Sequence, residues 1–349
     1  MNVSPIVHIC KMGSCRILNR GLYPIEALRW DVRCAVSGEE WFERRNDLRS
    51  CFIQISKAMS EKGHKSFLGE ILESSMNELV KLLSNSSSTA TWINWESAVW
   101  RARCVAHTMP NLAGQHLSKI LSMYCVKHGD ANSIIRMHAL LRATFVDGIR
   151  LTRTFWSSHK DTMPFALKLS IVGINAASNM SDEMIVKCDS AWFRGEHLDI
   201  MRTALVQSAS AAGITFNRLC QCASQDKHTL DVSLFSELMN AMSKLVYRST
   251  NASEKIPVFA LPAHIRRPVL QGLSALGSSL GKIEEAERSL NVLTADSWRT
   301  LDILVSSSDV SVLNWALQLL RALSSLEAVM YAVFERQHHR TPFFFSSLR

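Results

Sequence analysis

Apolar side chains recur every three or four residues from about Trp41 to the C-terminal region, whereas runs that alternate apolar and polar residues are scarce. The first spacing places side chains on one stripe of an α-helix, and the second is typical of strands. One stripe consists of Leu68, Leu72, Met76, Leu79 and Leu83. Another consists of Ile134, Met137, Leu141, Phe145 and Ile149. The pattern therefore predicts an all-α protein.

Loop-forming residues separate these helical stretches. Residues 84–91 are rich in Ser and Asn, and Pro110 favours a break before a further helix that ends near Gly129. Roughly a dozen helices of about 12 to 25 residues, joined by short breaks, fit an array of antiparallel pairs. We expect a degenerate α-solenoid, because no fixed repeat period is visible, and a compact bundle is the alternative.

The same loop-forming residues indicate how the chain is divided into segments. Residues 1–33 form a basic N-terminal segment, and residues 34–250 contain the main helical array. Residues 251–262 hold two prolines and small polar residues, which favours a loop or linker. Residues 263–349 then continue the array as C-terminal helices.

Composition is that of a folded intracellular protein. The chain is 47% hydrophobic and 20% charged, and its nine cysteines at irregular spacings do not suggest a disulfide framework. The longest uncharged stretches, around 169–181 and 203–217, are interrupted by polar residues and are shorter than a membrane-spanning helix requires. We therefore predict a reducing compartment and no transmembrane segment.

Charge favours an anionic partner and gives a hint of location. The net charge is +8 and the isoelectric point is about 9.1. At the N-terminus, Lys11, Arg16 and Arg20 precede the first acidic residue, Glu26, which is the charge balance of an organellar presequence. The mitochondrial matrix is the predicted location. An ordinary first helix, in a protein of the cytoplasm or nucleus, is the alternative.

No familiar catalytic or metal-binding motif is found. Cys220, Cys222 and His228 form the tightest group of soft ligands, but tetrahedral zinc needs a fourth ligand. Glycine-rich phosphate loops, dinucleotide fingerprints, nucleophile elbows and zinc-protease motifs are also missing. The sequence therefore predicts no cofactor, no metal and no catalytic residue, although a helical fold can assemble an enzyme site from distant positions.

Arginines interleaved with aromatic residues are the most suggestive functional feature. Cations neutralise phosphates, and exposed aromatic faces stack on bases. The predicted nucleic-acid-binding residues are Arg142, Arg150, Arg153, Phe155, Trp156 and Lys160, together with Arg101, Arg103, Arg266 and Arg267. The alternative is that such arginines are solvated or paired with acids on a neighbouring helix.

These observations favour a non-catalytic helical-repeat protein that binds RNA or a ribonucleoprotein assembly in an organelle. The second hypothesis is an armadillo-like or HEAT-like scaffold for other proteins, in which the charge is incidental. Steep salt dependence of RNA binding would favour the first hypothesis, and salt-insensitive protein association would favour the second. An enzyme with an unrecognised helical site is the third.

Overall fold

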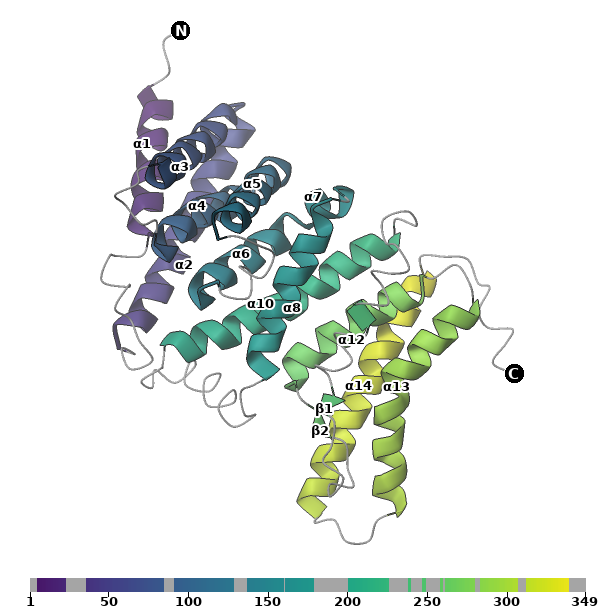
Figure 1. Cartoon of the computed structure of the whole chain (residues 1–349). Coiled ribbons are helices and arrows are strands. Elements are labelled where there is room, and N and C mark those ends of the chain that lie inside the picture. Colours follow the sequence, from purple (N-terminus) through teal and green to yellow (C-terminus); the bar gives the residue numbers. More distant parts are fainter. Residues whose placement is uncertain are drawn as a thin grey trace. The chain divides into compact units, whose positions relative to one another are not determined.

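The computed structural model describes residues 5–22, 36–84, 91–128, 137–159, 161–178, 200–225, 238–239, 247–248, 258–259, 261–279, 283–306 and 312–338. Helices dominate these residues, so the predicted all-α class is confirmed (Figure 1). The first helices are α1 (Pro5–Arg20), α2 (Val36–Glu61), α3 (Ser66–Ser84), α4 (Trp92–Val105), α5 (Pro110–His128), α6 (Ala139–Leu151) and α7 (Arg153–Ser158). The later helices are α8 (Met163–Ser178), α10 (Ile200–Gln225), α12 (Ala263–Gly277), α13 (Ile283–Ser306) and α14 (Val312–His338). Two short strands, β1 (Tyr247–Arg248) and β2 (Val258–Phe259), pair antiparallel with Tyr247 opposite Phe259.

The helix boundaries follow local chemistry. Pro110 is the first residue of α5, where its missing amide hydrogen would have no helical partner. The first stripe lies on α3, where Leu68 and Leu72 are buried, and that predicted helix is confirmed. In the second stripe, Leu141, Phe145 and Ile149 are buried on α6, which confirms that part of the predicted helix. Met137 precedes the first residue of α6, and Ile134 lies outside the described residues.

Contacts divide the chain into two compact units. Unit 1 comprises Met1–Gly173 and Glu183–Ala212, and unit 2 comprises Ile174–Asp182 and Gly213–Arg349. The division falls inside α8 and α10. Most of the predicted linker 251–262 lies outside the described residues, and the predicted domain boundaries stay a prediction.

Within unit 1, helices that alternate along the chain contact one another. α4 packs against both α2 and α6, and α5 packs against both α3 and α7. Consecutive helices also touch, as α3 does with α4 and α4 with α5. The core between them holds large side chains with almost no exposed surface, including Trp95, Trp100, Phe145 and Trp156. Burial of such side chains supplies most of the driving force for folding.

The first helix is part of this packing. Leu18 of α1 is buried, and Gly21 lies so close to Trp100 that a Cβ atom there would come within 2.8 Å of the indole Nε1. Lys11 pairs with Glu70 at 3.1 Å, and the side-chain oxygen of Asn19 accepts a hydrogen bond from Arg101. Gly21, which directly follows α1, therefore lies against the Trp100 indole.

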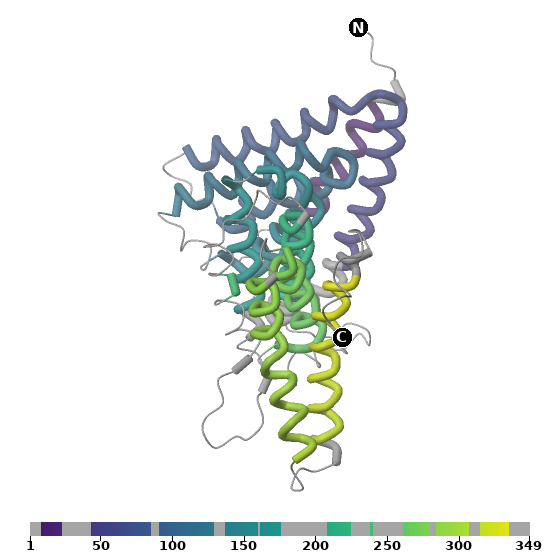
Figure 2. Tube along the Cα trace, turned by 90° about the vertical axis from the view of Figure 1, so that its right-hand side faces the viewer, coloured from purple at the N-terminus to yellow at the C-terminus, as the bar shows by residue number. Residues whose placement is uncertain are grey.

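Unit 2 is built around α14, which packs against α12 and α13 (Figures 1 and 2). The buried Arg266 guanidinium of α12 donates to Ser325 Oγ at 3.0 Å and to the Leu261 carbonyl at 2.9 Å. Gly272 allows α12 to approach α10, since an added Cβ would meet the Asn217 Cα at 3.0 Å. The indole of Trp315 donates to the Leu304 carbonyl and joins α13 to α14.

One stretch of α14 bears on the predicted absence of a membrane span. Trp315–Phe334 is long and apolar enough to cross a membrane, with a mean hydropathy of 1.3, and 39% of it is buried. A single such helix also occurs in the cores of soluble proteins, and α14 packs here against α12 and α13. The absence of a transmembrane segment stays a prediction.

His138 makes the stability of unit 1 depend on pH. Its ring caps the start of α6 by accepting a hydrogen bond from the Leu140 amide, and it stacks on Trp92 with ring centroids 4.0 Å apart. Burial, with a smaller contribution from the charge of Arg142, lowers the pKa of His138 from 6.5 to about 4. Between about pH 6.5 and 4, His138 is therefore protonated in the unfolded chain and neutral in the folded chain.

We expect the free energy of unfolding to fall as the pH drops from about 6.5 towards 4. The effect of His138 between pH 7.5 and 5 is about 1 kcal/mol after allowance for its partial exposure. Urea denaturation at the two pH values measures the change. A His138→Asn variant keeps a capping side chain without the titration, so its pH dependence should be shallower. An equal pH dependence in both proteins would contradict this prediction.

Candidate anion-binding site

Three neighbouring helices turn polar side chains towards one another in unit 1. The residues recur at helical spacing on each helix, so that each set shares one face. They are Arg45 and Arg49 on α2, Glu96, Trp100 and Arg103 on α4, and Thr144, Asp147 and Arg150 on α6.

We call these facing side chains of α2, α4 and α6 the polar seam. Its inner end is a buried ion pair. The Arg45 Nη2 atom lies 2.6 Å from Glu96 Oε1, and both side chains are nearly inaccessible to solvent. The Thr144 hydroxyl lies 2.6 Å from the same carboxylate oxygen. The Arg45 guanidinium also lies 3.9 Å from the centroid of the Trp100 ring, in cation–π geometry. The charges at this end are balanced.

At the outer end, three arginines surround one carboxylate. Arg150 donates to Asp147 Oδ1 from Nε at 2.8 Å and from Nη2 at 2.6 Å. Arg103 donates to Asp147 Oδ2 from Nε at 2.5 Å and also pairs with it through Nη2. Arg49 reaches the same oxygen only at 3.9 Å. We refer to Arg49, Arg103, Arg150 and Asp147 as the arginine cluster.

The local electrostatics reflect this excess of positive charge. Burial raises the pKa of Asp147, but the charges and hydrogen bonds of Arg103 and Arg150 outweigh it and leave that pKa below its ordinary value. Burial, followed by the charges of Arg49 and Arg103, lowers the pKa of the neighbouring His107. Burial likewise raises the pKa of the nearby Cys104 thiol to about 12. His107 and Cys104 are therefore neutral at pH 7.

The cluster is open enough to meet a ligand. The side chains of Arg49 and Arg150 are 24% and 37% exposed.

Comparison with protein-family models, curated proteins and solved structures finds no match to this chain. The function of the site is therefore inferred from the chemistry of its own residues. Planar guanidinium groups that converge at a partly desolvated surface bind carboxylates and phosphates by paired hydrogen bonds.

The structure brings together two of the predicted nucleic-acid-binding residues, Arg103 and Arg150, and places others elsewhere. Arg101 points away from the cluster and donates to Glu78 at 2.5 Å and to Asn19 at 3.1 Å. Arg142 is buried, and its Nη1 atom donates to the Met137 carbonyl. Arg153 is exposed at the start of α7.

The predicted aromatic contacts differ most from expectation. Phe155 and Trp156 were expected to offer exposed faces, but both are buried. Phe155 packs on His159, and the Trp156 indole donates to Thr152 Oγ1 at 2.8 Å. Because burial of a large aromatic ring is favourable, both rings lie in the core and not on the surface. Neither ring is placed to stack on a base, and Lys160 lies outside the described residues.

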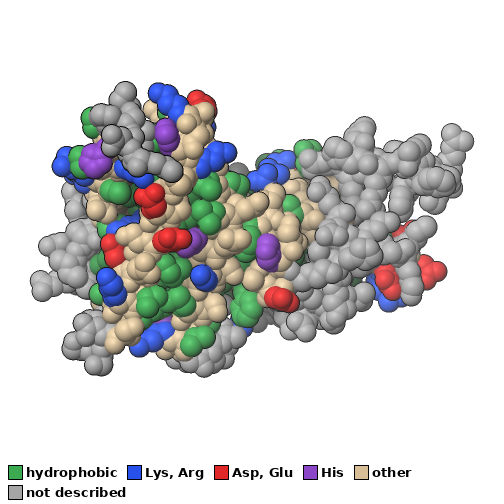
Figure 3. Space-filling model, turned by 90° about the horizontal axis from the view of Figure 1, so that it is seen from above, with side chains coloured by type: hydrophobic (Ala, Val, Ile, Leu, Met, Phe, Trp, Pro, Cys, Tyr) green, Lys and Arg blue, Asp and Glu red, His purple; other side chains and the backbone are tan. Residues whose placement is uncertain are grey.

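The last two predicted residues belong to unit 2. Arg266 is buried against α14, whereas Arg267 is exposed and pairs with Glu327 at 2.5 Å. On the face of the molecule in Figure 3, the described basic side chains are dispersed among hydrophobic and acidic ones, and these described side chains form no continuous stripe. The role of the predicted set in nucleic-acid binding stays a prediction.

Arg49, Asp147 and His107 were missed in the sequence. The available signal was the spacing of Arg45 and Arg49, which places two arginines on one face of a helix. Asp147 lies three residues before Arg150, a second helical spacing. The sequence does not reveal that α2, α4 and α6 face one another, so these side chains could not be assigned to a common site.

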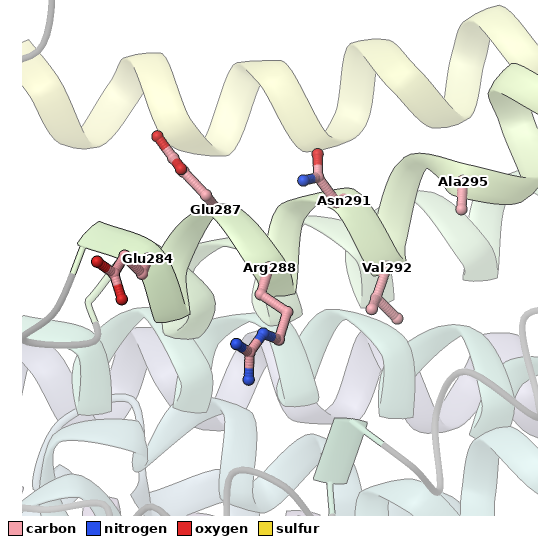
Figure 4. A pocket seen from close by; sticks show the side chains of 6 residues that line it. All are labelled: Glu284, Glu287, Arg288, Asn291, Val292 and Ala295. Atoms are coloured by element: carbon pink, nitrogen blue, oxygen red, sulfur yellow. The ribbon is translucent and has the colours of Figure 1, made fainter. Parts of the chain in front are cut away.

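A surface hollow elsewhere offers less chemistry. Its six lining residues all lie on α13, namely Glu284, Glu287, Arg288, Asn291, Val292 and Ala295. Figure 4 shows Glu287 and Asn291 on the side of α13 towards α14, while Arg288 and Val292 point the other way. Across the residues that the structure describes, no group of three His, Cys, Asp or Glu side chains is arranged to hold a metal.

Proposed function

We propose that this chain is a non-catalytic helical-repeat protein that binds RNA through phosphate contacts at the arginine cluster. The observation that carries the proposal is the sharing of one carboxylate, Asp147, by three partly exposed arginines. A phosphate group supplies the negative charge that this arrangement lacks. The net charge of +8 favours association with a polyanion over the whole molecule.

We also propose that the helices of unit 1 form a degenerate α-solenoid. The alternating contacts of α2, α4 and α6, and of α3, α5 and α7, support it, because stacked helix pairs produce two such layers. In that arrangement the arginine cluster belongs to a single layer. The proposed location is the mitochondrial matrix, which is supported by the basic composition of residues 1–33.

The double variant Arg49→Gln with Arg150→Gln tests RNA binding. We expect its affinity for a single-stranded RNA to fall about tenfold or more, because two charge-assisted contacts are lost. The slope of log K against log salt concentration should become shallower by about 1.4. Fluorescence anisotropy of a labelled RNA across a salt series measures both quantities.

A matched control separates the site from net charge. Arg218→Gln with Arg288→Gln removes the same charge from two exposed positions in unit 2 and should leave most of the affinity. Circular dichroism confirms that each variant stays folded. Equal losses of affinity in the two double variants would contradict a role for the cluster.

The scaffold hypothesis has an observation of its own. Leu317, Leu320, Leu323, Met330, Tyr331 and Phe334 are exposed and fall within one arc of α14. The exposed Glu327, which pairs with Arg267, lies within the same arc, so the surface is apolar with one acidic residue. Exposed apolar side chains gathered on one helix face are typical of protein-binding sites. Association with a protein partner that is insensitive to salt, together with no affinity for RNA, would favour the scaffold over the first proposal.

A further inference from the structure

The charge balance of the polar seam suggests which kind of phosphate the arginine cluster accepts. Arg45 is neutralised by Glu96 at the inner end. At the outer end, three guanidinium groups share one carboxylate, which leaves two positive charges in excess among the described side chains. His107 adds no charge at pH 7, because burial and the neighbouring arginines lower its pKa.

Arg49 is the member of the cluster with the fewest partners. Within the described part of the chain, its closest ionic contact is the 3.9 Å approach to Asp147. Its Nε atom is buried and has no hydrogen-bond partner there. A buried donor without a partner costs free energy, so the Arg49 guanidinium is incompletely satisfied. Its side chain is 24% exposed, and an anion bound at that exposed part would give it a charge-assisted contact.

The excess charge is concentrated at one point. Internal phosphates of RNA carry one negative charge each, and a strand held by several of them needs a row of cations. Among the other predicted contact residues that the structure describes, Arg101 and Arg267 are paired with acids, and Arg142 and Arg266 are buried. Arg153 is exposed on α7 and is the one further described cation of this set that is neither buried nor paired with an acid. A terminal phosphomonoester instead carries a charge of about −1.5 to −2 at pH 7 on three acceptor oxygens. Its charge and its three oxygens match the excess charge and the three arginines.

We propose that the arginine cluster binds the terminal phosphomonoester of an RNA strand, with Arg49 as the residue that distinguishes a terminal phosphate from an internal one. The inference rests on the proposed RNA binding and names the part of the RNA that the site recognises. Asp147 acts as a positioning residue, because its two oxygens hold Arg103 and Arg150 in place.

Three synthetic RNAs of one sequence and one internal fluorescent label test the proposal. The first carries a 5′-phosphate, the second a 3′-phosphate, and the third hydroxyl groups at both ends. We expect the native chain to bind one phosphorylated strand about tenfold more tightly than the hydroxyl strand. The Arg49→Gln variant should bind all three strands alike, and the Arg218→Gln control should keep the preference.

The outcomes separate this inference from the proposed function. Equal affinities of the native chain for all three strands would overturn the terminal-phosphate site, while a loss of affinity in Arg49→Gln with Arg150→Gln would still support RNA binding. Failure of the native chain to bind any of the strands would overturn both.

His107 provides a readout at the site itself. Burial, followed by the charges of Arg49 and Arg103, lowers the pKa of its imidazole. A bound phosphomonoester offsets those positive charges, so the pKa should rise. NMR titration of the histidine ring protons, assigned with a His107→Gln variant, measures the change. We expect a larger rise with the phosphorylated strand than with the hydroxyl strand, because a terminal phosphate carries more negative charge than an internal one. A pKa that is the same with both strands would count against phosphate binding beside His107.

Discussion

Replacement of Glu96 by alanine is expected to lower the free energy of unfolding of unit 1 by about 3–5 kcal/mol, because it leaves the buried Arg45 guanidinium without its carboxylate. The Thr144 hydroxyl loses an acceptor in the same change. Globular domains are stable by only about 5–15 kcal/mol, so this loss would be a large part of the total stability. Chemical denaturation followed by circular dichroism measures the loss.

Two further variants test whether the loss of the buried carboxylate opposite Arg45 causes this effect. Glu327→Ala breaks the exposed pair with Arg267 and should cost no more than about 1 kcal/mol. Replacement of both buried partners, with Arg45→Met and Glu96→Leu, should recover much of the stability lost in Glu96→Ala. A double variant as unstable as Glu96→Ala alone would show that packing, and not the isolated charge, dominates.

Gly114→Ala is expected to destabilise the chain by about 2–3 kcal/mol through overpacking between α5 and α7. The added Cβ would lie 2.5 Å from Phe155 Cγ and 2.6 Å from Phe155 Cβ. These atoms are next to the backbone of α7, so a change of rotamer does not remove the clash. Either the two helices must separate or the Phe155 ring must leave the core. The shift in the midpoint of thermal unfolding measures the cost.

Gly69→Ala is the control for this variant. Gly69 lies inside α3, where an added Cβ would make an ordinary contact of 3.9 Å with Leu112. Because alanine favours a helix more than glycine does, we expect a gain of about 0.5–1 kcal/mol. Destabilisation by both substitutions, to a similar extent, would show that the approach to Phe155 is not the cause.

The helices could be predicted because their determinants are local. The stripes on α3 and α6 and the proline that begins α5 all express helical periodicity or backbone chemistry within a few residues. Packing of one helix against another depends on residues far apart in the chain. Arg49 and Asp147 are 98 positions apart, and no local pattern indicates that they meet.

The basic and aromatic residues show why composition alone misplaces a site. Arginine and tryptophan are used both on binding surfaces and in ion pairs and cores, and only burial distinguishes these uses. Arg150 is partly exposed in the cluster, whereas Trp156 is buried in the core only six positions later. The sequence contains both residues in one apparent cluster, and the fold separates them.

The contact between Gly21 and Trp100 has a consequence for cleavage near the N-terminus. Cleavage of a leader anywhere after Gly21 would remove Leu18 from the core and uncover an indole that Gly21 now shields. The ion pair between Lys11 and Glu70 would be lost as well. Residues 5–21 are therefore part of the folded unit, and their loss would expose apolar surface that they now cover.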